Sequence, residues 1–235
     1  MSALTIVGDS FGCGAWQNGR GPGDGYFTTK FEEYYKAVYN HCEPGCSNYD
    51  ILNKIETVLL EETKLRFRSA FLVIQTDPIR TVLPFQSRAL YMHDTDYYHV
   101  IKDDYKEFTD KLIDFFYFNL NNLAQEYNVI FNLSGGCSDI DVNLAQKYKN
   151  LNVACDSFYK ILDSTHALSS ASNTHVACIE NSKNGAKDIV NGVSSKIRIQ
   201  EEYQGRYFGE YPDVHPSRKG INLWIPEIQK RMKYR

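Results

Sequence analysis

Hydrophobic residues are arranged along this chain in two alternating ways. Short continuous apolar runs bounded by turn residues are typical of buried strands, whereas apolar residues that recur every three or four positions indicate helices. Strands are expected at about 4–7, 39–43, 70–75, 128–133 and 152–155. Helices are expected at about 28–38, from 51 onward, at 98–127 and at 221–228. This alternation predicts an α/β fold with a parallel sheet covered by helices on both faces, because parallel strands need crossover connections.

Turn and cap signals refine this picture. Ser47-Asn48-Tyr49-Asp50 caps the helix whose apolar positions follow at Ile51, Leu52, Ile55, Val58 and Leu59. Residues 77–97 are expected to form a long loop at a binding edge, and Ser134-Gly135-Gly136 a turn at the same edge of the sheet. Residues 156–209 are poorly patterned and are expected to cover the site as helix and loop. No internal repeat or low-complexity linker divides the chain, so we expect one domain over residues 1–235.

Composition and charge exclude several classes of function. With 235 residues, 43% of them hydrophobic, the chain can bury a sizeable core. Its net charge of −3 leaves no basic footprint for nucleic acid or for an anionic membrane. No apolar run approaches the ~20 residues of a membrane helix. Met1-Ser2-Ala3 leads directly into a strand, so we expect no signal peptide and synthesis in the cytoplasm.

The six cysteines could in principle hold a metal ion. Cys42 and Cys46 lie close in sequence and His41 precedes them, but a zinc site needs further ligands at suitable spacing. Repeated Cys-x-x-Cys spacing is absent from the sequence. We therefore expect reduced, mostly buried thiols, with neither a metal nor another cofactor.

The first expected strand ends in a motif that can carry chemistry. Leu4-Thr5-Ile6-Val7 runs into Gly8-Asp9-Ser10, which places Ser10 at the carboxyl end of a strand, where open α/β sheets bind their ligands. Backbone N–H groups in such a turn can stabilise an oxyanion, so Ser10 is a candidate nucleophile. A strand that ends in a turn capped by Asp or Ser would explain the same residues.

The other end of the chain supplies a candidate base. Asp213 lies two residues before His215, between Pro212 and Pro216, and the expected C-terminal helix follows. A serine nucleophile needs a base within hydrogen-bond reach and a third group to orient that base. His215 and Asp213 can provide both from one stiff loop. The alternative is that His215 is a surface turn residue.

With these residues in place, the chain resembles the SGNH or GDSL hydrolases. Val7-Gly8-Asp9-Ser10-Phe11 is similar to the first block of that family. Pro44-Gly45-Cys46-Ser47-Asn48-Tyr49-Asp50-Ile51 is similar to the second, and Phe71-Leu72-Val73-Ile74-Gln75-Thr76-Asp77-Pro78 falls where the third is expected. The resemblance implies a flavodoxin-like three-layer α/β/α sandwich with about five parallel strands. It also implies that Ser10 is the nucleophile and that the oxyanion is held by the N–H groups of Ser10 and Gly45, with a third donor from the third block. Asp213 and His215 fall in the last block.

Two positions depart from the family pattern. The third block normally carries an Asn as its oxyanion donor, and the candidates here are Thr76 and Asp77. A threonine hydroxyl can donate a hydrogen bond, whereas an ionised aspartate would repel the oxyanion. The family also places its Asp three residues before the His, a position held here by Pro212. His215 would then form a triad with Asp213 from a different backbone angle, or a dyad oriented by a backbone carbonyl.

These expectations predict a serine esterase that hydrolyses ester-linked acyl groups. The Gly-Cys-Ser-Asn and His-Pro-Ser-x-x-Gly sequences are similar to hydrolase-like proteins of tailed bacteriophages, which implies O-acetyl groups on a carbohydrate as the substrate and virion proteins as further partners. The alternative is a non-catalytic SGNH-like structural or glycan-binding module, favoured if Asp77 rather than Thr76 faces Ser10. Nucleotide binding is disfavoured, because the strand end lacks Gly-x-Gly-x-x-Gly and a Walker lysine.

Overall fold

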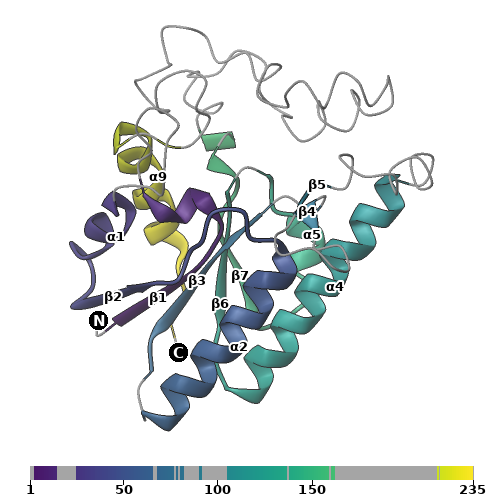
Figure 1. Cartoon of the computed structure of the whole chain (residues 1–235), viewed down its shortest axis with the longest axis horizontal. Helices are drawn as coiled ribbons and strands as arrows, with labels where there is room; N and C mark the ends of the chain where they lie inside the picture. The colour runs from purple at the N-terminus through teal and green to yellow at the C-terminus, as the bar shows by residue number, and fades with distance from the viewer. Residues whose placement is uncertain are drawn as a thin grey trace, which may run out of the picture.

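The chain is described from a computed structural model. The described residues are 3–14, 25–65, 68–76, 78, 80–81, 90–91, 105–136, 138–158, 160–161, 216 and 218–234. Within them, five strands form one parallel sheet (Figure 1). These strands are β1 (Ala3–Gly8), β2 (Ala37–Asn40), β3 (Ala70–Gln75), β6 (Phe131–Gly135) and β7 (Leu151–Cys155). Their order in the sheet is β2-β1-β3-β6-β7, which confirms the flavodoxin-like arrangement.

Helices connect these strands. The described ones are the 3-10 turn η1 (Ser10–Cys13), α1 (Tyr26–Phe31), α2 (Asn48–Lys64), α4 (Tyr105–Glu126), α5 (Val142–Ala145) and α9 (Arg218–Arg231). A small antiparallel pair, β4 (Arg80–Thr81) and β5 (Leu90–Tyr91), lies within the segment expected to be a long loop. None of the described helices is both long enough and apolar enough to span a membrane.

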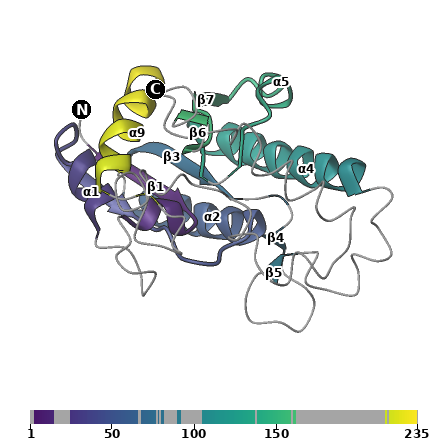
Figure 2. The ribbon, with the colours of Figure 1, turned by 90° about the horizontal axis from the view of Figure 1, so that it is seen from above.

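The helices cover both faces of the sheet, so the three-layer α/β/α sandwich is confirmed. Alternate residues of β3 point to opposite faces: Leu72 and Ile74 pack with α1 and α9, whereas Phe71 and Val73 pack with α2 and α4. In Figure 2, strands β1 and β3 lie between α9 and α2. On the first face, the buried ring of Trp224 in α9 packs against aromatic rings from α1 and from the segment after β7. Two hydrophobic layers therefore hold the central strands on both sides.

The structure corrects the expected bounds near the second strand. The helix expected over 28–38 ends at Phe31, and the strand expected over 39–43 is β2, at Ala37–Asn40. The reason is tertiary, because Ala37 pairs with Ala3 and Asn40 with Ile6 in the parallel ladder with β1. Residues after β2 continue beside β1 through the hydrogen bond from the Glu43 N–H to the Gly8 carbonyl (3.0 Å).

The other expected strands and helices are found with smaller shifts. The strand expected at 128–133 begins at Phe131, because Asn128 adopts a positive φ of 53° after α4. Strand β3 matches its expected range, and the C-terminal helix extends the expected 221–228 to Arg218–Arg231. Helix α4 starts at Tyr105 in the described part, and most of 156–209 lies outside the described residues.

Candidate active site

Three candidate site residues follow three neighbouring strands. Ser10 comes after β1, Gly45 follows β2 in the connection to α2, and Thr76 comes directly after β3. Strand β1 lies between β2 and β3, so Ser10 lies between the other two in the order of the sheet (Figure 1). The chain reverses its direction of winding between β1 and β3, and open α/β sheets bind ligands at such a switch point. The strand order thus brings these residues to one edge of the sheet.

The turn that carries Ser10 is held by Asp9. The Asp9 Oδ1 atom accepts a hydrogen bond from the Phe11 N–H (3.0 Å), and the Asp9 carbonyl accepts one from the Gly12 N–H (3.2 Å). Asp9 is therefore the N-cap of η1, as the capping interpretation of the sequence expected. This cap is compatible with a nucleophile at Ser10, since it fixes the backbone of the residue that starts the turn. Ser10 itself is 5% exposed.

Close backbone packing holds η1 on both sides. On the β2 side, Asn40 Nδ2 donates to the Gly12 carbonyl (2.7 Å), and a Cβ atom at Gly12 would lie 2.3 Å from the Cys42 Sγ atom. On the other side, a Cβ atom at Gly136, which follows β6, would lie 3.2 Å from the Cβ atom of Phe11 in η1. Residues at the end of β2 and just after β2 and β6 therefore pack closely against η1.

Gly45 occupies a backbone conformation that favours glycine. Its φ is +85°, although a Cβ atom there would meet nothing within 4 Å, so conformation rather than crowding explains the glycine. Within the described part of the chain, its N–H donates to no acceptor. Helix α2 starts just after it with a complete capping box, in which Ser47 and Asp50 bond each other's backbone N–H (2.8 and 3.2 Å).

Thr76 is fully buried, and its backbone is firmly held. Its N–H donates to Asn48 Oδ1 (3.1 Å), and its carbonyl accepts from Asn48 Nδ2 (3.2 Å) and from Ser138 Oγ (3.3 Å). The Thr76 hydroxyl, in contrast, has no hydrogen-bond partner among the described residues. Asp77, the other candidate for this position, lies outside the described residues. A buried hydroxyl without a partner among the described residues is rare in native proteins and is open to a hydrogen bond with a bound ligand.

The other two candidate catalytic residues, Asp213 and His215, lie outside the described residues. The described chain resumes at Pro216, which is buried, and then at Arg218. The Arg218 guanidinium lies 5.1 Å from the centre of the Tyr26 ring, and Tyr26 donates a hydrogen bond to Asn222 in α9 (3.0 Å). Tyr26 also borders Gly14, since a Cβ atom at Gly14 would lie 2.9 Å from the Tyr26 N atom. The first turn of α9 therefore begins near the end of η1.

Electrostatics near Ser10 disfavour a competing thiol nucleophile. Burial, reinforced by the negative charge of Asp9, raises the pKa of Cys13 to about 12. Burial also raises the pKa of Cys46 to about 11 and that of Cys42 well above its ordinary value. These thiols are free and stay protonated at neutral pH, and thiols need the thiolate form to attack. Across the described residues, no group of three or more His, Cys, Asp or Glu side chains is arranged to hold a metal ion.

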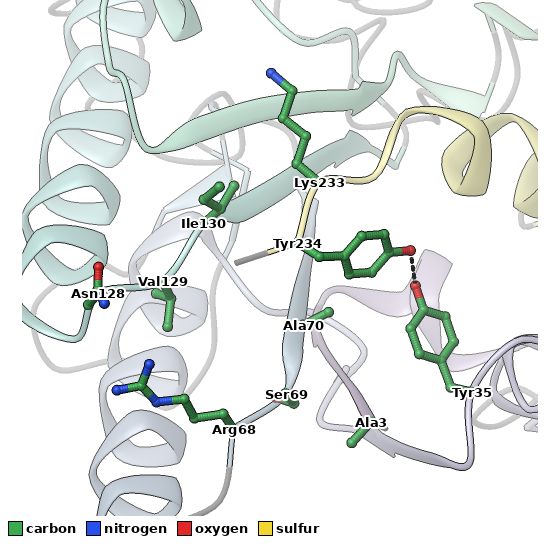
Figure 3. A pocket seen from close by; sticks show the side chains of 10 residues that line it. All are labelled: Ala3, Tyr35, Arg68, Ser69, Ala70, Asn128, Val129, Ile130, Lys233 and Tyr234. Carbon is green, nitrogen blue, oxygen red and sulfur yellow. Dashed lines mark hydrogen bonds between the residues drawn. The ribbon is translucent and has the colours of Figure 1, made fainter. Parts of the chain in front are cut away.

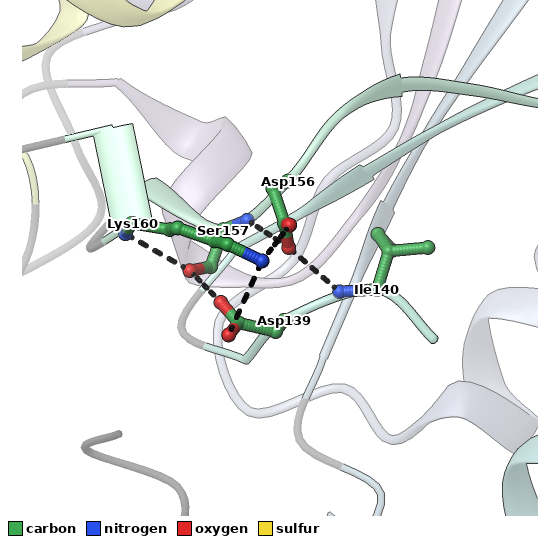
Figure 4. A network of polar contacts seen from close by, with 5 residues as sticks. All are labelled: Asp139, Ile140, Asp156, Ser157 and Lys160. Atoms are coloured by element: carbon green, nitrogen blue, oxygen red, sulfur yellow. Dashed lines mark hydrogen bonds and ion pairs between the residues drawn. The ribbon is translucent and has the colours of Figure 1, made fainter. Parts of the chain in front are cut away.

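A polar network that sequence reasoning missed joins the ends of β6 and β7 (Figure 4). Asp156 Oδ1 accepts hydrogen bonds from the N–H groups of Ile140 and Ser157 (both 3.0 Å), and Ser157 Oγ donates to Asp139. The Lys160 ammonium bonds Asp156 Oδ2 (2.5 Å). Because every carboxylate here has a donor within the network, we interpret it as a support for these two strand ends. The hydrogen bonds that join its two segments, 139–140 and 156–160, connect residues 16 and 18 positions apart, so the contact follows only from the pairing of β6 with β7.

A pocket of about 270 Å³ lies at the opposite, amino edge of the sheet (Figure 3). Its wall contains Ala3 and Ala70 from the starts of β1 and β3, and Tyr35, whose hydroxyl meets that of Tyr234 (2.6 Å). In Figure 3 the side chain of Lys233 points away from that of Arg68, so the two cations do not converge on one ligand position. The described candidate residues Ser10, Gly45 and Thr76 are not part of its wall.

Comparisons with known proteins add weak likenesses only. The sequence matches no known protein family and no curated protein. Among solved structures, the chain is similar to a lipase/acylhydrolase from Enterococcus faecalis, with 12% identity, a TM-score of 0.43, and coverage of 100% of this chain and 99% of that one. It is also similar to the psychrotrophic esterase EstA from Pseudoalteromonas sp., with 11% identity, a TM-score of 0.39, and coverage of 82% and 100%. These likenesses carry no conclusion about function, which has to be inferred from the residues of the site.

Proposed function

We propose that this protein is a serine hydrolase of carboxylic esters, with Ser10 as its nucleophile. The observation that carries the proposal is the strand order, which flanks Ser10 with Gly45 on one side and Thr76 on the other. Gly45 has an N–H without an acceptor among the described residues, and Thr76 has a buried hydroxyl without a partner there. A nucleophile with hydrogen-bond donors on both sides is what the tetrahedral intermediate of acyl transfer requires.

The proposed reaction has two steps. The Ser10 Oγ atom attacks the ester carbonyl carbon while His215 takes the hydroxyl proton, and the carbonyl oxygen becomes an oxyanion held by the N–H groups of Ser10 and Gly45 and the hydroxyl of Thr76. The intermediate then collapses, and the alcohol leaves with the proton from His215. In the second step, water attacks the acyl-enzyme with His215 again as the base, which releases the carboxylic acid and restores Ser10. Asp213 orients His215 in both steps.

The substrate class proposed with this reaction is a carbohydrate that carries O-acetyl groups. Its support is the resemblance of Gly45-Cys46-Ser47-Asn48 and of the segment after His215 to hydrolase-like proteins of tailed bacteriophages. In that setting the protein would be a virion component that contacts other virion proteins. No cofactor or metal enters the reaction as proposed.

Hydrolysis of p-nitrophenyl acetate by the wild-type chain and by Ser10→Ala tests the proposal. We expect wild-type turnover, labelling of Ser10 by a fluorophosphonate probe, and loss of both in Ser10→Ala. Ser69→Ala is the matched control, because the Ser69 hydroxyl is hydrogen-bonded to Thr5 (2.6 Å) and Glu62 (2.5 Å), away from the site. Its removal should not affect turnover. Equal turnover by wild type and Ser10→Ala would contradict the proposal. Absence of turnover and labelling, also with an acetylated glycan, would favour the non-catalytic SGNH-like module.

A further inference from the structure

The side chain of Asn48, at the start of α2, forms a pair of hydrogen bonds with the backbone of Thr76, at the end of β3. The Asn48 carboxamide bonds both backbone groups of Thr76, accepting from its N–H (3.1 Å) and donating to its carbonyl (3.2 Å). Both residues are buried. An amide that bonds the N–H and the carbonyl of one residue restrains both of its backbone dihedrals, in the same way as pairing with a neighbouring strand.

Thr76 therefore has one polar group left for a ligand. Its N–H is taken by Asn48 and its carbonyl is shared by Asn48 and Ser138, so only the hydroxyl remains unpaired within the described part of the chain. The direction of a threonine hydroxyl follows the backbone, because β-branched side chains have few allowed χ1 values. If the backbone of Thr76 is restrained, the direction of its hydroxyl is restrained as well.

Asn48 is also linked to the other proposed donor. It is the first residue of α2, directly after the N-cap Ser47, whose capping box with Asp50 fixes the start of the helix. Gly45 lies three residues before Asn48 in the same connection. The two donors that flank Ser10 are therefore joined through one buried side chain, although Gly45 and Thr76 belong to segments after different strands.

We infer that Asn48 is a positioning residue for the oxyanion hole, which holds the Thr76 hydroxyl toward the ester oxygen and couples it to the Gly45 segment. This inference rests on the proposed hydrolase function. Asn48 does not contact the substrate; it acts through Thr76. Small displacements of a group that stabilises a transition state reduce the rate strongly, so the effect should appear in kcat rather than in KM.

A double-mutant cycle tests this inference on the intact chain. With p-nitrophenyl acetate, we expect Thr76→Val to lower kcat on the order of a hundredfold and Asn48→Ala to lower it by roughly tenfold to a hundredfold, with KM nearly unchanged. Because Asn48 acts through Thr76, the double variant should be no slower than Thr76→Val alone. The inference would be overturned if the fold-losses of kcat in the two single variants multiplied in the double variant, or if a folded Asn48→Ala kept wild-type kcat.

The structure offers a matched control for the loss of a buried amide. Asn132 bonds Lys233 in the same paired way, with the Lys233 N–H to Asn132 Oδ1 at 2.7 Å and Asn132 Nδ2 to the Lys233 carbonyl at 3.0 Å, at the amino edge of the sheet. Asn132→Ala should lower the melting temperature and leave kcat unchanged. An equal loss of kcat in Asn132→Ala would show that Asn48 acts only through general stability.

Two further measurements distinguish a folding defect of Asn48→Ala and a failure of the proposed function from a failure of this inference. If Asn48→Ala does not fold, Asn48→Asp replaces it in the cycle, since a carboxylate keeps the size of the side chain and the acceptor for the Thr76 N–H while repelling the Thr76 carbonyl. The same loss of kcat and the same lack of additivity are then expected, and wild-type kcat in Asn48→Asp would overturn the inference. A wild-type chain that neither hydrolyses esters nor reacts with the fluorophosphonate would refute the proposed function, and this inference with it.

Discussion

Gly136 lies against Asp9 at the carboxyl edge of the sheet. A Cβ atom on Gly136 would lie 3.2 Å from Asp9 Oδ1, the oxygen that caps η1, and 3.2 Å from the Cβ atom of Phe11. The same position is 3.3 Å from the Gln75 carbonyl oxygen, so the ends of β1, β3 and β6 meet at this glycine. The turn that carries Ser10 is thus packed closely against the end of β6, with little room for an added methyl group.

We predict that Gly136→Ala displaces the Asp9 cap. Overpacking of this kind typically costs about 1–3 kcal/mol of unfolding free energy, and movement of η1 should also lower the rate of ester hydrolysis. Denaturant unfolding and kcat measure the two effects. Gly135→Ala is a useful comparison, because its Cβ atom would lie 2.2 Å from the Ser138 carbonyl oxygen and should destabilise the fold more. A Gly136→Ala protein with unchanged stability and kcat would contradict this prediction.

Replacement of Gly45 should lower both stability and kcat because it strains the backbone. Because its φ is +85° and the space around a Cβ atom is open, Gly45→Ala is expected to cost about 1–3 kcal/mol in strain and to shift the N–H that serves as an oxyanion donor. Gly25→Ala is the matched control, since Gly25 has φ +73° and equally open space. We expect similar losses of stability in the two variants and a loss of kcat in Gly45→Ala alone. Equal kcat in both would argue against a role for Gly45.

The identity of the third oxyanion donor can be tested at two adjacent positions. We expect Thr76→Val to lower kcat far more than it raises KM, because it removes a donor at nearly constant shape. Thr5→Val, which alters another buried threonine that is bonded to Glu62 (2.9 Å), should leave kcat unchanged. Asp77→Asn is expected to alter the rate little. A sharp increase in rate for Asp77→Asn would instead identify Asp77 as the residue that faces Ser10.

His215 is predicted to lie within hydrogen-bond reach of Ser10. His215→Gln should then lower kcat by a factor of a thousand or more, while fluorophosphonate labelling of Ser10 slows in parallel, because the serine loses its base. An experimental structure of the phosphonylated protein would measure the distance between the Ser10 Oγ atom and the imidazole ring directly. A separation of more than ~7 Å would exclude direct proton transfer.

We predict that His41 makes the protein less stable as the pH falls. Burial lowers the pKa of His41 below its ordinary value, and the positive charge of Lys54 lowers it further. In this pH range the folded protein therefore binds fewer protons at His41 than the unfolded chain, in which the histidine has a pKa of about 6.5. The contribution of His41 to stability should be fully present above that pH and be lost as the pH falls through the lower, folded pKa.

Urea unfolding between about pH 7.5 and pH 5 measures this effect. We expect the wild type to lose more unfolding free energy over this range than His41→Asn, because only the wild type carries the titrating His41 side chain. The other titrating groups are common to both proteins, so their contributions cancel in the difference. Identical pH profiles would contradict the prediction.

Several features of this protein follow from the sequence alone, because they depend on neighbouring residues. The apolar run that becomes β3 and the cap formed by residues 47–50 both lie where the sequence predicts them. A cap or a strand pattern depends on residues only a few positions apart, so the local sequence is sufficient. The alternation of strands and helices was likewise sufficient for the α/β class. The motif at Ser10 marked the carboxyl end of β1 for the same reason.

Other features depended on contacts between distant segments, and only the tertiary structure decided them. The start of β2 at Ala37 is set by its ladder with β1, which overrides the helical pattern around it. The position of β1 between β2 and β3 puts Ser10 between Gly45 and Thr76, and no local pattern encodes that order. The two hydrogen bonds between Asn48 and Thr76 join residues that are 28 positions apart in the sequence, because folding packs the start of α2 against the end of β3. Local propensities cannot express such contacts, since they form only when the sheet assembles.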